Sequence, residues 1–482
     1  MNKKVLNKNI ILVILQNIIA ILFPIITFPY ISKTLSVETI GRFNFIESIL
    51  NFLNLIAIFG INSYAVREGV RLREDKEQFN KLISELFFIN IITTLFSYFL
   101  MFVCVETISE LHQERFYIYL FSIQIIFYVF SMDWILIIYE KYFFKTIQTF
   151  VFKFLYIFLL FLFVRKSSDL LSYIIITTII TIASYISVII YNKNFYKLRR
   201  IHIKDCIYHF KPICILFIDS LTHMIYTGSD IILLGFMQTD YIIGIYSFSV
   251  KIYTTLRIFL ACILLAAYPR VSFLYGTKEY KKIVQYIYDI TMLLMLPCIV
   301  GLLLVSKKLI FLIGNKQYIK SIPSLHILTI CLLFSIIAWI HSQLILLPSK
   351  KDFKILKSTI LSAIVNIILN IIFIPILKER ATAISTLISE FVMFILLQRN
   401  GKDVYQINFI NKNIKDAIIG CIGIFIVCVI VPLIQKTSSH FVLIITILLS
   451  ILVYITTLTI MKNEMIISLF KNKKNIKEIN KI

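Results

Sequence analysis

Hydrophobic residues along this chain gather in blocks of roughly 18 to 25 residues, and shorter polar stretches separate the blocks. A helix that rises 1.5 Å per residue needs about 20 residues to cross a hydrocarbon core about 30 Å thick, so each block has the length of one membrane-spanning helix. A membrane β-barrel would instead alternate apolar and polar residues over segments of about ten. The pattern therefore predicts an all-α integral membrane protein.

About fourteen such blocks can be placed along the chain. Their centres lie near Ile21, Leu50, Leu95, Ile126, Phe158, Ile180, Leu221, Phe259, Leu296, Leu333, Leu369, Leu387, Phe425 and Leu448. The first block follows a basic start and resembles a signal peptide, but it runs past Phe28, contains Pro24 and Pro29 and lacks a small-residue cleavage site. We therefore expect it to remain as the first span.

Basic residues mark one side of the membrane. They gather near the N-terminus and in alternate connections, namely Lys3, Lys4 and Lys8, Arg67 to Lys81, Lys141 to Lys145, Lys193 to Lys211, Arg270 to Lys282, Lys350 to Lys357, and the Lys471 to Lys481 tail. Because Lys and Arg favour cytoplasmic loops, both termini are predicted to be cytoplasmic. Lys307, Lys308, Lys316 and Lys320 are the exception to the alternation.

Composition narrows the function classes. Of 482 residues, 59% are hydrophobic and 16% charged, and the formal charge is +23. In a soluble protein this charge would suggest nucleic-acid binding, but topology accounts for it here, and no nucleic-acid partner is expected. The eight cysteines show no disulfide or metal-binding spacing. Motifs for nucleotide binding, zinc-dependent hydrolysis or a serine nucleophile are missing, so we predict a transporter with no catalytic residues, no cofactor and no metal.

A short internal repeat suggests a duplication. GRFNFIESI at Gly41 to Ile49 matches GIYSFSVKI at Gly244 to Ile252, and Arg67 and Arg270 keep the same register beyond the matches. Such halves would be parallel repeats, related by a pseudo-two-fold axis along the membrane normal. The predicted domains are an N-lobe of six helices at 1–191, a basic cytoplasmic linker at 192–211, a C-lobe of six helices at 212–399, and two further helices with a basic tail at 400–482.

Polar residues form a stripe on the second predicted span. Steps of three and four residues place them on one helix face. They are Asn44, Glu47, Ser48, Asn51 and Asn54, and their repeat partners include Ser247, Lys251, Thr254 and Arg257. A charge at mid-bilayer costs about 2.5–3.5 kcal/mol on insertion scales, so the charged members must face a wet cavity or pair with other charges. The first alternative predicts a substrate cavity, and the second a structural ion pair.

The seventh predicted span carries Asp219, His223 and Asp230 on one narrow face. Carboxylates and imidazoles bind protons or coordinate cations, so this row is a candidate ion-coupling site. The alternative is that the row clamps neighbouring helices and that Asp230 lies at the membrane interface. Glu390 and His341 are predicted to make helix-to-helix hydrogen bonds.

Several segments resemble a known family. The first, Phe28 to Glu68, reads FPYISKTLSVETIGRFNFIESILNFLNLIAIFGINSYAVRE. The others, in the family's order, are SDIILLGFMQTDYIIGIYSFSVKIY, AAYPRVS, FLIGNKQYIKSIPSLHIL and NIILNIIFIPILKERATAISTLISE. Together they resemble the bacterial polysaccharide repeat-unit flippases, the O-antigen flippase family. The sequence departs from the family at Ser36, where Gly is usual, and at Glu379 to Ala381, which replaces a Gly-rich turn.

The resemblance implies a member of the multidrug, oligosaccharidyl-lipid and polysaccharide exporter superfamily, with two six-helix lobes around a cationic cavity. It implies an oligosaccharide joined through pyrophosphate to a polyprenyl lipid, flipped from the inner to the outer leaflet of the bacterial cytoplasmic membrane for O-antigen, capsule or exopolysaccharide synthesis. Further expected partners are membrane lipid, a repeat-unit polymerase and a chain-length regulator, together with H⁺ or Na⁺ at the polar row of the seventh span. A fixed cation can replace part of the hydration of a diphosphate, so Lys251 and Arg257 are the expected contacts, with the second-span amides touching sugar hydroxyls.

Two alternatives stay open. One is a sibling activity on the same fold, either a lipid-linked peptidoglycan precursor flippase or a drug/cation antiporter. The other is a membrane enzyme, a polymerase or a polyprenyl-phosphate glycosyltransferase. Such enzymes usually carry a sizeable extracytoplasmic loop, and the outer connections here are short.

Overall fold

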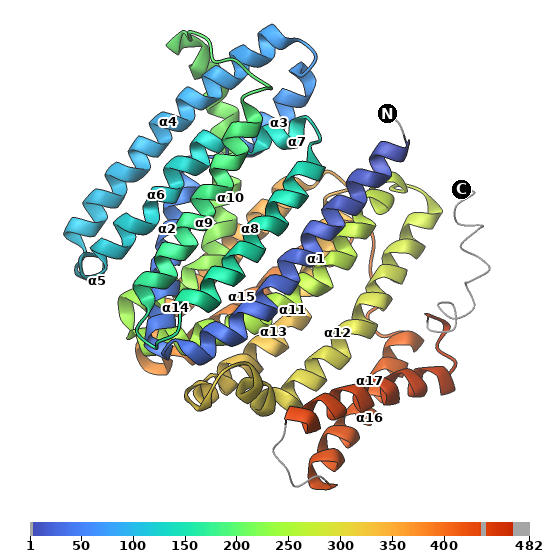
Figure 1. Cartoon of the computed structure of the whole chain (residues 1–482). Coiled ribbons are helices and arrows are strands. Elements are labelled where there is room, and N and C mark those ends of the chain that lie inside the picture. The colour runs from blue at the N-terminus through green and yellow to red at the C-terminus, as the bar shows by residue number, and fades with distance from the viewer. Residues whose placement is uncertain (1–2, 435–439, 466–482) are drawn as a thin grey trace. The chain divides into compact units, whose positions relative to one another are not determined.

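The computed structural model of the protein describes residues 3–434 and 440–465, and these residues form helices and no strand (Figure 1). Every predicted centre lies inside a helix. Twelve of the described helical segments have the length and hydropathy needed to cross a membrane. Two long helices, α1 and α10, are not among the twelve, and α10 carries the polar row of Asp219, His223 and Asp230. The chain is therefore an all-α, multi-span membrane protein.

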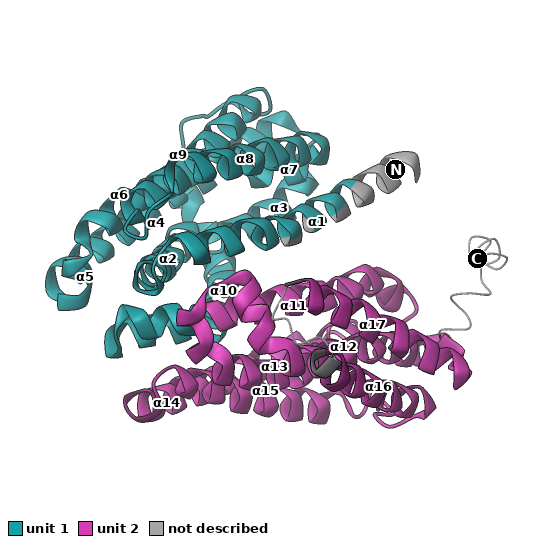
Figure 2. Ribbon diagram, turned by 60° about the horizontal axis from the view of Figure 1, so that its bottom comes forward, with its two compact units in different colours: residues 1–247 teal, residues 248–482 magenta. Residues whose placement is uncertain are grey.

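The chain divides into two compact units, Met1–Ser247 and Phe248–Ile482, which Figure 2 colours separately. The helices of unit 1 are α1 (Lys3–Thr34), α2 (Val37–Ile58), α3 (Ile61–Leu72), α4 (Lys76–Thr107), α5 (Ser109–Gln113), α6 (Arg115–Ser131), α7 (Trp134–Ile138), α8 (Tyr142–Phe163), α9 (Leu170–Asn192) and α10 (Ile203–Met237). The next helix, α11 (Asp240–Phe273), begins in unit 1 and continues in unit 2.

The remaining elements belong to unit 2. They are α12 (Lys278–Ile313), the 3₁₀-helix η1 (Lys316–Ser321), α13 (Ile322–Ile340), the π-helix η2 (His341–Leu346), α14 (Asp352–Leu377), α15 (Glu379–Gly401), α16 (Lys412–Ile434) and α17 (His440–Ile460). The lobe boundaries predicted from the sequence stay predictions, and the basic Lys471 to Lys481 tail lies outside the described residues.

The connections of unit 1 alternate between two ends. At one end, Arg73 after α3 pairs with Glu140 before α8 at 3.3 Å. At the other end, the N–H of Ser36 between α1 and α2 donates to the carbonyl of Ser167 between α8 and α9 at 3.2 Å. This alternation agrees with the one inferred from the basic residues. The assignment of one end to the cytoplasm stays a prediction.

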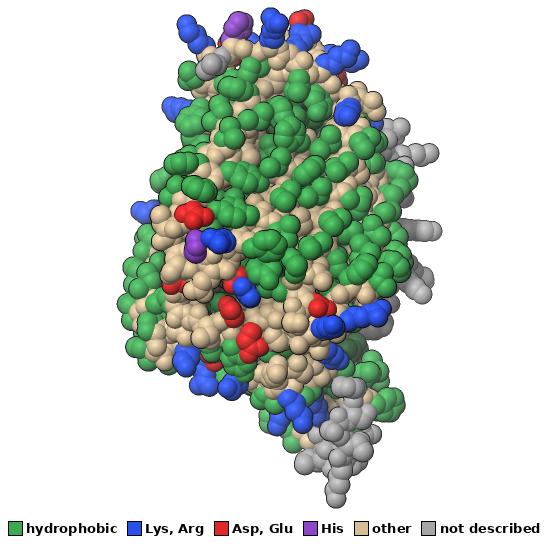
Figure 3. All heavy atoms as spheres, turned by 60° about the vertical axis from the view of Figure 1, so that its left-hand side comes forward, with side chains coloured by type: hydrophobic (Ala, Val, Ile, Leu, Met, Phe, Trp, Pro, Cys, Tyr) green, Lys and Arg blue, Asp and Glu red, His purple; other side chains and the backbone are tan. Residues whose placement is uncertain are grey.

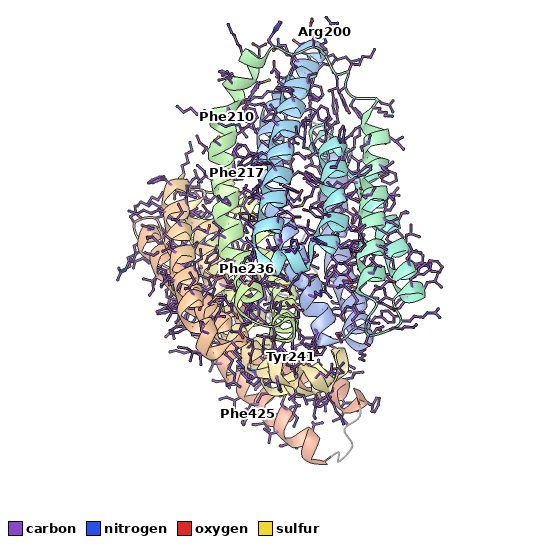
Figure 4. The ribbon with its side chains drawn as sticks, turned by 90° about the vertical axis from the view of Figure 1, so that its left-hand side faces the viewer. Arg200, Phe210, Phe217, Phe236, Tyr241 and Phe425 are labelled. Atoms are coloured by element: carbon purple, nitrogen blue, oxygen red, sulfur yellow. The ribbon has the colours of Figure 1, made fainter. Side chains whose placement is uncertain are left out.

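The first helix after the predicted linker, α10, packs along α2, α3 and α4 of unit 1. Phe217 and Phe210 stack on Phe59 with ring centroids 4.3 and 5.9 Å apart. Phe236 meets Phe45 edge-on at 5.6 Å. Figure 4 shows the three phenylalanines of α10 spaced along its length. Aromatic pairs of this kind add about 0.5–1.5 kcal/mol each beyond the area they bury, so α10 is fixed to unit 1 at several levels.

Unit 2 repeats the order of elements found in unit 1. In unit 1 a long helix, α4, is followed by the short α5, then by α6, the short α7, α8 and α9. In unit 2 the long α12 is followed by the short η1, then by α13, the short η2, α14 and α15. The same irregular segments recur at the same places, as expected if both halves descend from one six-helix unit.

The helices α16 and α17 form a hairpin that packs on α12. Gly420 allows this contact, because a Cβ there would lie 2.7 Å from the ring of Tyr454. The hydroxyl of Tyr454 donates to the carbonyl of Leu293 at 2.7 Å. In the first turn of α16, the amide of Asn413 donates to the carboxylate of Asp289 on α12 at 2.8 Å. The rest of this contact is apolar, formed by Ala417, Cys421, Ile424 and Leu458 with Leu293. The hairpin therefore belongs with unit 2.

Apolar side chains form a broad band on the face shown in Figure 3, and charged side chains gather at its two ends. Phe154 and Phe158 of α8 are 67% and 57% exposed. Large exposed apolar surfaces are costly in water and favourable in lipid. This distribution matches a protein whose solvent is the bilayer.

Candidate functional site

The polar stripe of α2 is present in unit 1, but most of its members already have local partners. The Asn44 amide donates to the carbonyl of Ile40 at 2.8 Å, and the Ser48 hydroxyl donates to the carbonyl of Phe45 at 2.7 Å. Glu47 is half-buried, in electrostatic reach of Tyr156 and Tyr173. These contacts fix the side chains without requiring a substrate.

Two amides of the same helix keep spare hydrogen-bonding capacity. The Asn51 side chain is exposed. The Oδ1 atom of Asn54 is buried and has no hydrogen-bond partner among the described residues. An unsatisfied buried acceptor costs about 1–3 kcal/mol, so a ligand hydroxyl or water that donates to Asn54 would be favoured.

The first turns of α2 and α11 cross at a pair of glycines. A Cβ at Gly41 would lie 1.8 Å from the carbonyl oxygen of Asp240, and a Cβ at Gly244 would lie 2.1 Å from that of Val37. Gly41 matches Gly244 in the sequence repeat, and Val37 matches Asp240, so the contact is reciprocal. Reciprocal contacts of this kind are the mark of a two-fold relationship. Within unit 1, the crossing supports the duplication.

The α11 stripe holds the cations expected to bind phosphate. Lys251 is exposed, and no carboxylate of the described residues lies within ion-pair distance of it. The hydroxyl of Thr254, one turn further on, donates to the carbonyl of Val250 at 2.8 Å. Ser247 is buried, and its Oγ has no hydrogen-bond partner among the described residues. Lys251 is thus the cation of the stripe with a free charge.

Arg257, by contrast, belongs to an ion pair within unit 2. Its guanidinium lies 3.7 Å from the carboxylate of Glu390 on α15 and 5.7 Å from the ring centre of Trp339 on α13. The Glu390 side chain is only 4% exposed. The sequence singled out Glu390 but assigned it hydrogen bonding, because the pairing joins residues far apart in the chain. Any anion at Arg257 would share it with Glu390.

The polar row of α10 is only partly exposed. Asp219 and His223 lie on the surface of the helix one turn apart. Asp230 is half-buried and accepts a hydrogen bond of 2.7 Å from the Tyr246 hydroxyl on α11. The role of the row in ion coupling stays a prediction.

A buried hydrogen-bond chain in unit 1 escaped the sequence interpretation. His209 of α10 bonds the Tyr64 hydroxyl through Nδ1 at 2.7 Å and the Glu85 carboxylate through Nε2 at 2.8 Å. Lys81 lies 3.7 Å from Glu85 and 2.7 Å from Asp205. These hydrogen bonds and ion pairs connect α3, α4 and α10. The sequence does show these residues as isolated polar positions next to apolar blocks. Which of them pair with one another depends on how the three helices pack, and the sequence does not reveal that.

The all-helical fold agrees with the comparisons to known proteins. The family model described as "Polysaccharide biosynthesis protein" matches residues 6–274, more than half of the chain. The chain belongs to this polysaccharide biosynthesis protein family. A relative in Shigella dysenteriae, a putative O-antigen transporter, is 28% identical over 286 residues, which cover 58% of this chain and 71% of the relative.

Solved structures of MATE transporters share the fold. One is an inward-facing multidrug resistance MATE transporter of the MOP superfamily. The match covers 78% of this chain and 96% of the transporter, with a TM-score of 0.56 and 13% identity. Another is the MATE multidrug transporter DinF-BH. That match covers 84% of this chain and 97% of the transporter, with a TM-score of 0.52 and 16% identity. The family resemblance seen in the sequence is confirmed, and so is the prediction of a transporter rather than an enzyme.

The two departures from the family pattern have local explanations. Ser36 caps α2, because its Oγ accepts the backbone N–H of Thr39 at 3.2 Å. The turn before Glu379 is made by Lys378 at φ 52°, a left-handed conformation that Gly adopts more easily. Both departures lie at helix ends and leave the α2 and α11 stripes intact.

Proposed function

We propose that this protein is a flippase for a polyprenyl-pyrophosphate-linked oligosaccharide. It moves the repeat unit from the cytoplasmic to the outer leaflet of a bacterial cytoplasmic membrane by alternating access, for O-antigen, capsule or exopolysaccharide synthesis. Membership of the polysaccharide biosynthesis protein family supports this proposal, as does the likeness to a putative O-antigen transporter. The single observation that carries the chemistry is the free cation of Lys251.

The diphosphate head group binds at Lys251 in this proposal. An ammonium supplies three donors and a point charge, which offset the cost of removing a phosphate from water. Thr254 lies on the same helix face and adds a hydroxyl. Arg257 assists while it remains paired with Glu390, which holds the guanidinium in place. The amides of Asn51 and Asn54 on α2 take sugar hydroxyls.

The membrane potential drives part of the movement. With the inside negative, moving one negative charge outward gains about 2.3 kcal/mol per 100 mV. A second contribution would come from H⁺ or Na⁺ bound at Asp219, His223 and Asp230. A polymerase and a chain-length regulator would receive the product on the outer side.

Replacing Lys251 tests the head-group assignment. Lys251→Ala should reduce surface polysaccharide at least tenfold with normal protein abundance, since a charge-assisted contact is worth about 1.5–3 kcal/mol. Lys251→Arg should retain much of the display, because it preserves the charge. Lys281→Ala, which removes an exposed lysine of α12, serves as the matched control. Normal polymer display by Lys251→Ala would refute the assignment.

Ion coupling is tested separately at Asp219. In proteoliposomes, Asp219→Asn should remove the pH dependence of flipping while substrate binding persists. A merely structural role would lower stability and leave the pH profile of the remaining activity unchanged. An unaltered profile would therefore exclude Asp219 from coupling.

A further inference from the structure

A small cavity opens on unit 1 between α3 and α7. Its volume is about 290 Å³, and it is lined by Asn62, Ser63, Val66, Asp133, Trp134 and Ile137. This volume lies just below the range for drug-sized sites, roughly 300–1,000 Å³. The cavity suits one small ring rather than an extended chain. None of these residues belongs to the polar stripes described above.

Two helix breaks build the cavity. Between α2 and α3 the backbone turns through left-handed conformations at Phe59 and Gly60, with φ of 49° and 76°. Between α6 and α7 it does so at Met132, with φ of 44°. Each break starts a new short helix, and these two helices pack together. Their first turns bring polar side chains to one place on a rigid scaffold, as a binding site requires.

The polar side chains of the cavity are held by neighbours and still have free atoms. The Asn62 amide donates to the Tyr128 hydroxyl at 2.5 Å. Lys145 pairs with one carboxylate oxygen of Asp133. No hydrogen bond from the described residues uses Asn62 Oδ1, the second Asp133 oxygen or the Ser63 hydroxyl. The site therefore offers two fixed acceptors and one hydroxyl.

The chemistry of this lining favours a sugar ring over other ligands. Asp133 and Lys145 form an ion pair, so the lining has no net charge to attract either a phosphate or a free cation. A lipid tail would leave the polar atoms without partners. A pyranose has hydroxyls that donate to carboxylate and amide oxygens, and its C–H faces pack on apolar groups. Val66, Ile137 and Trp134 provide such groups.

We propose that this cavity binds a single sugar residue of the transported oligosaccharide. The inference rests on the proposed function, which supplies a glycosylated substrate. The short α3 also carries Arg67 and Arg71, which places the cavity in the half of unit 1 predicted to face the cytoplasm. Binding of a sugar there would orient the glycolipid as it enters, so Asn62, Ser63 and Asp133 would influence which repeat units are accepted.

Trp134 provides a direct reporter, because the chain contains only two tryptophans, Trp134 and Trp339. The purified full-length protein is titrated with methyl glycosides of glucose, galactose, N-acetylglucosamine and N-acetylgalactosamine while tryptophan fluorescence is recorded. At least one glycoside should produce a saturable change. Trp339→Phe should keep the change, and Trp134→Phe should lose it. Inorganic pyrophosphate should leave the emission of Trp134 unaltered.

Variants then test the individual groups. Asp133→Asn should weaken glycoside binding about tenfold by removing a charged acceptor. Ser63→Phe should abolish binding by filling the cavity, whereas Ser168→Phe, at an exposed position between α8 and α9, should bind like the parent. The proposal is overturned if no glycoside gives a saturable change, if pyrophosphate rather than a glycoside changes the emission of Trp134 in the Trp339→Phe variant, or if both Asp133→Asn and Ser63→Phe bind like the parent.

The outcome is separable from that of the proposed function. Sugar binding reported by Trp134 together with normal polymer display by Lys251→Ala would refute the head-group assignment and keep the cavity. Loss of display in Lys251→Ala without glycoside binding would keep the flippase and discard the cavity. A change in polymer composition in Ser63→Ala, at normal protein abundance, would support a role in selecting the substrate.

Discussion

The second helix of the first repeat and its partner in the second repeat share a register but follow different courses. In unit 1, α2 ends and the chain turns at Phe59 and Gly60 before α3 begins. The partner helix α11 continues without a break to Phe273. Cys262 and Ile263 stand at the matching positions. One copy of the duplicated helix has thus acquired a break that the other lacks.

The break between α2 and α3 allows the backbone of α10 to pack closely against Gly60. A Cβ at Gly60 would lie 2.7 Å from the backbone nitrogen of Phe217 and 2.9 Å from the carbonyl oxygen of Ile213. The same break starts α3 and so places Asn62 and Ser63 at the cavity. The helix α11 has a side chain at Ile263, which no backbone can approach so closely. The two repeats therefore share the order and register of their helices. Differences at single positions, such as Gly60 and Ile263, give each repeat different packing contacts.

The largest effect is expected from Gly60→Ala. A left-handed backbone costs a non-glycine residue about 1–2 kcal/mol, and forcing a methyl group against the α10 backbone adds about 1–3 kcal/mol. The free energy of unfolding should fall by about 3 kcal/mol, as measured by SDS titration in mixed micelles. Gly301→Ala is the matched control, because nothing lies within 4 Å of a Cβ there, and it should stabilise α12 by about 0.5–1 kcal/mol. If Gly60→Ala and Gly301→Ala changed the free energy of unfolding equally, the close packing of α10 against Gly60 would be contradicted.

The glycine crossing should respond almost as strongly. In Gly41→Ala and Gly244→Ala the new methyl group meets a carbonyl oxygen of the other helix. Each variant should lose about 2–3 kcal/mol through overpacking. Because either methyl group separates the same pair of helices, the double variant should lose less than the sum. Additive losses would show that the two contacts are independent and would weaken the argument for reciprocity.

Sequence alone predicted the helices well, because a span is dictated by length and hydropathy, which are local properties. The breaks at Gly60 and Met132 were not predicted, since apolar residues continue across both. The pairing of Arg257 with Glu390 was out of reach for another reason: an ion pair between distant residues depends on how α11 and α15 pack. The sugar cavity combines both difficulties, with residues from two unpredicted breaks.

Arg257→Ala should cause the next largest loss in the free energy of unfolding. Replacing Asn54, which stands at the matching position of the first repeat, should cause a much smaller loss. Arg257→Ala leaves the Glu390 carboxylate buried without its cation. Breaking a buried pair costs ~3–5 kcal/mol, but the Arg257 side chain is 24% exposed and the atoms are 3.7 Å apart, so we expect about 2 kcal/mol. Asn54→Ala should cost less than about 0.5 kcal/mol, because its Oδ1 has no partner among the described residues. Glu390→Gln should restore stability to Arg257→Ala, and failure to do so would contradict the pairing.

The smallest effect concerns the connections between the last two helices of each repeat. Lys378 alone joins α14 to α15, whereas Val164 to Asp169 join α8 to α9. Backbone N–H groups of Arg165 and Lys166 donate to the Asp169 carboxylate at 2.9 and 2.8 Å and hold its pKa below the usual range. A lowered carboxyl pKa stabilises the folded state above the unfolded-state pKa, and this contribution is lost as pH falls through the folded-state pKa.

The comparison to make is Asp169→Asn with the parent, by thermal unfolding in detergent between pH 7 and pH 3. The parent should have the higher Tm by a constant margin from pH 7 down to about 4, the usual pKa of an aspartate. Below that pH the margin should shrink, because the parent carboxylate becomes protonated. Since Asp169 is only partly buried, the margin itself should be small. A margin that already closes between pH 7 and pH 5 would show that another group, and not Asp169, governs the stability of this connection.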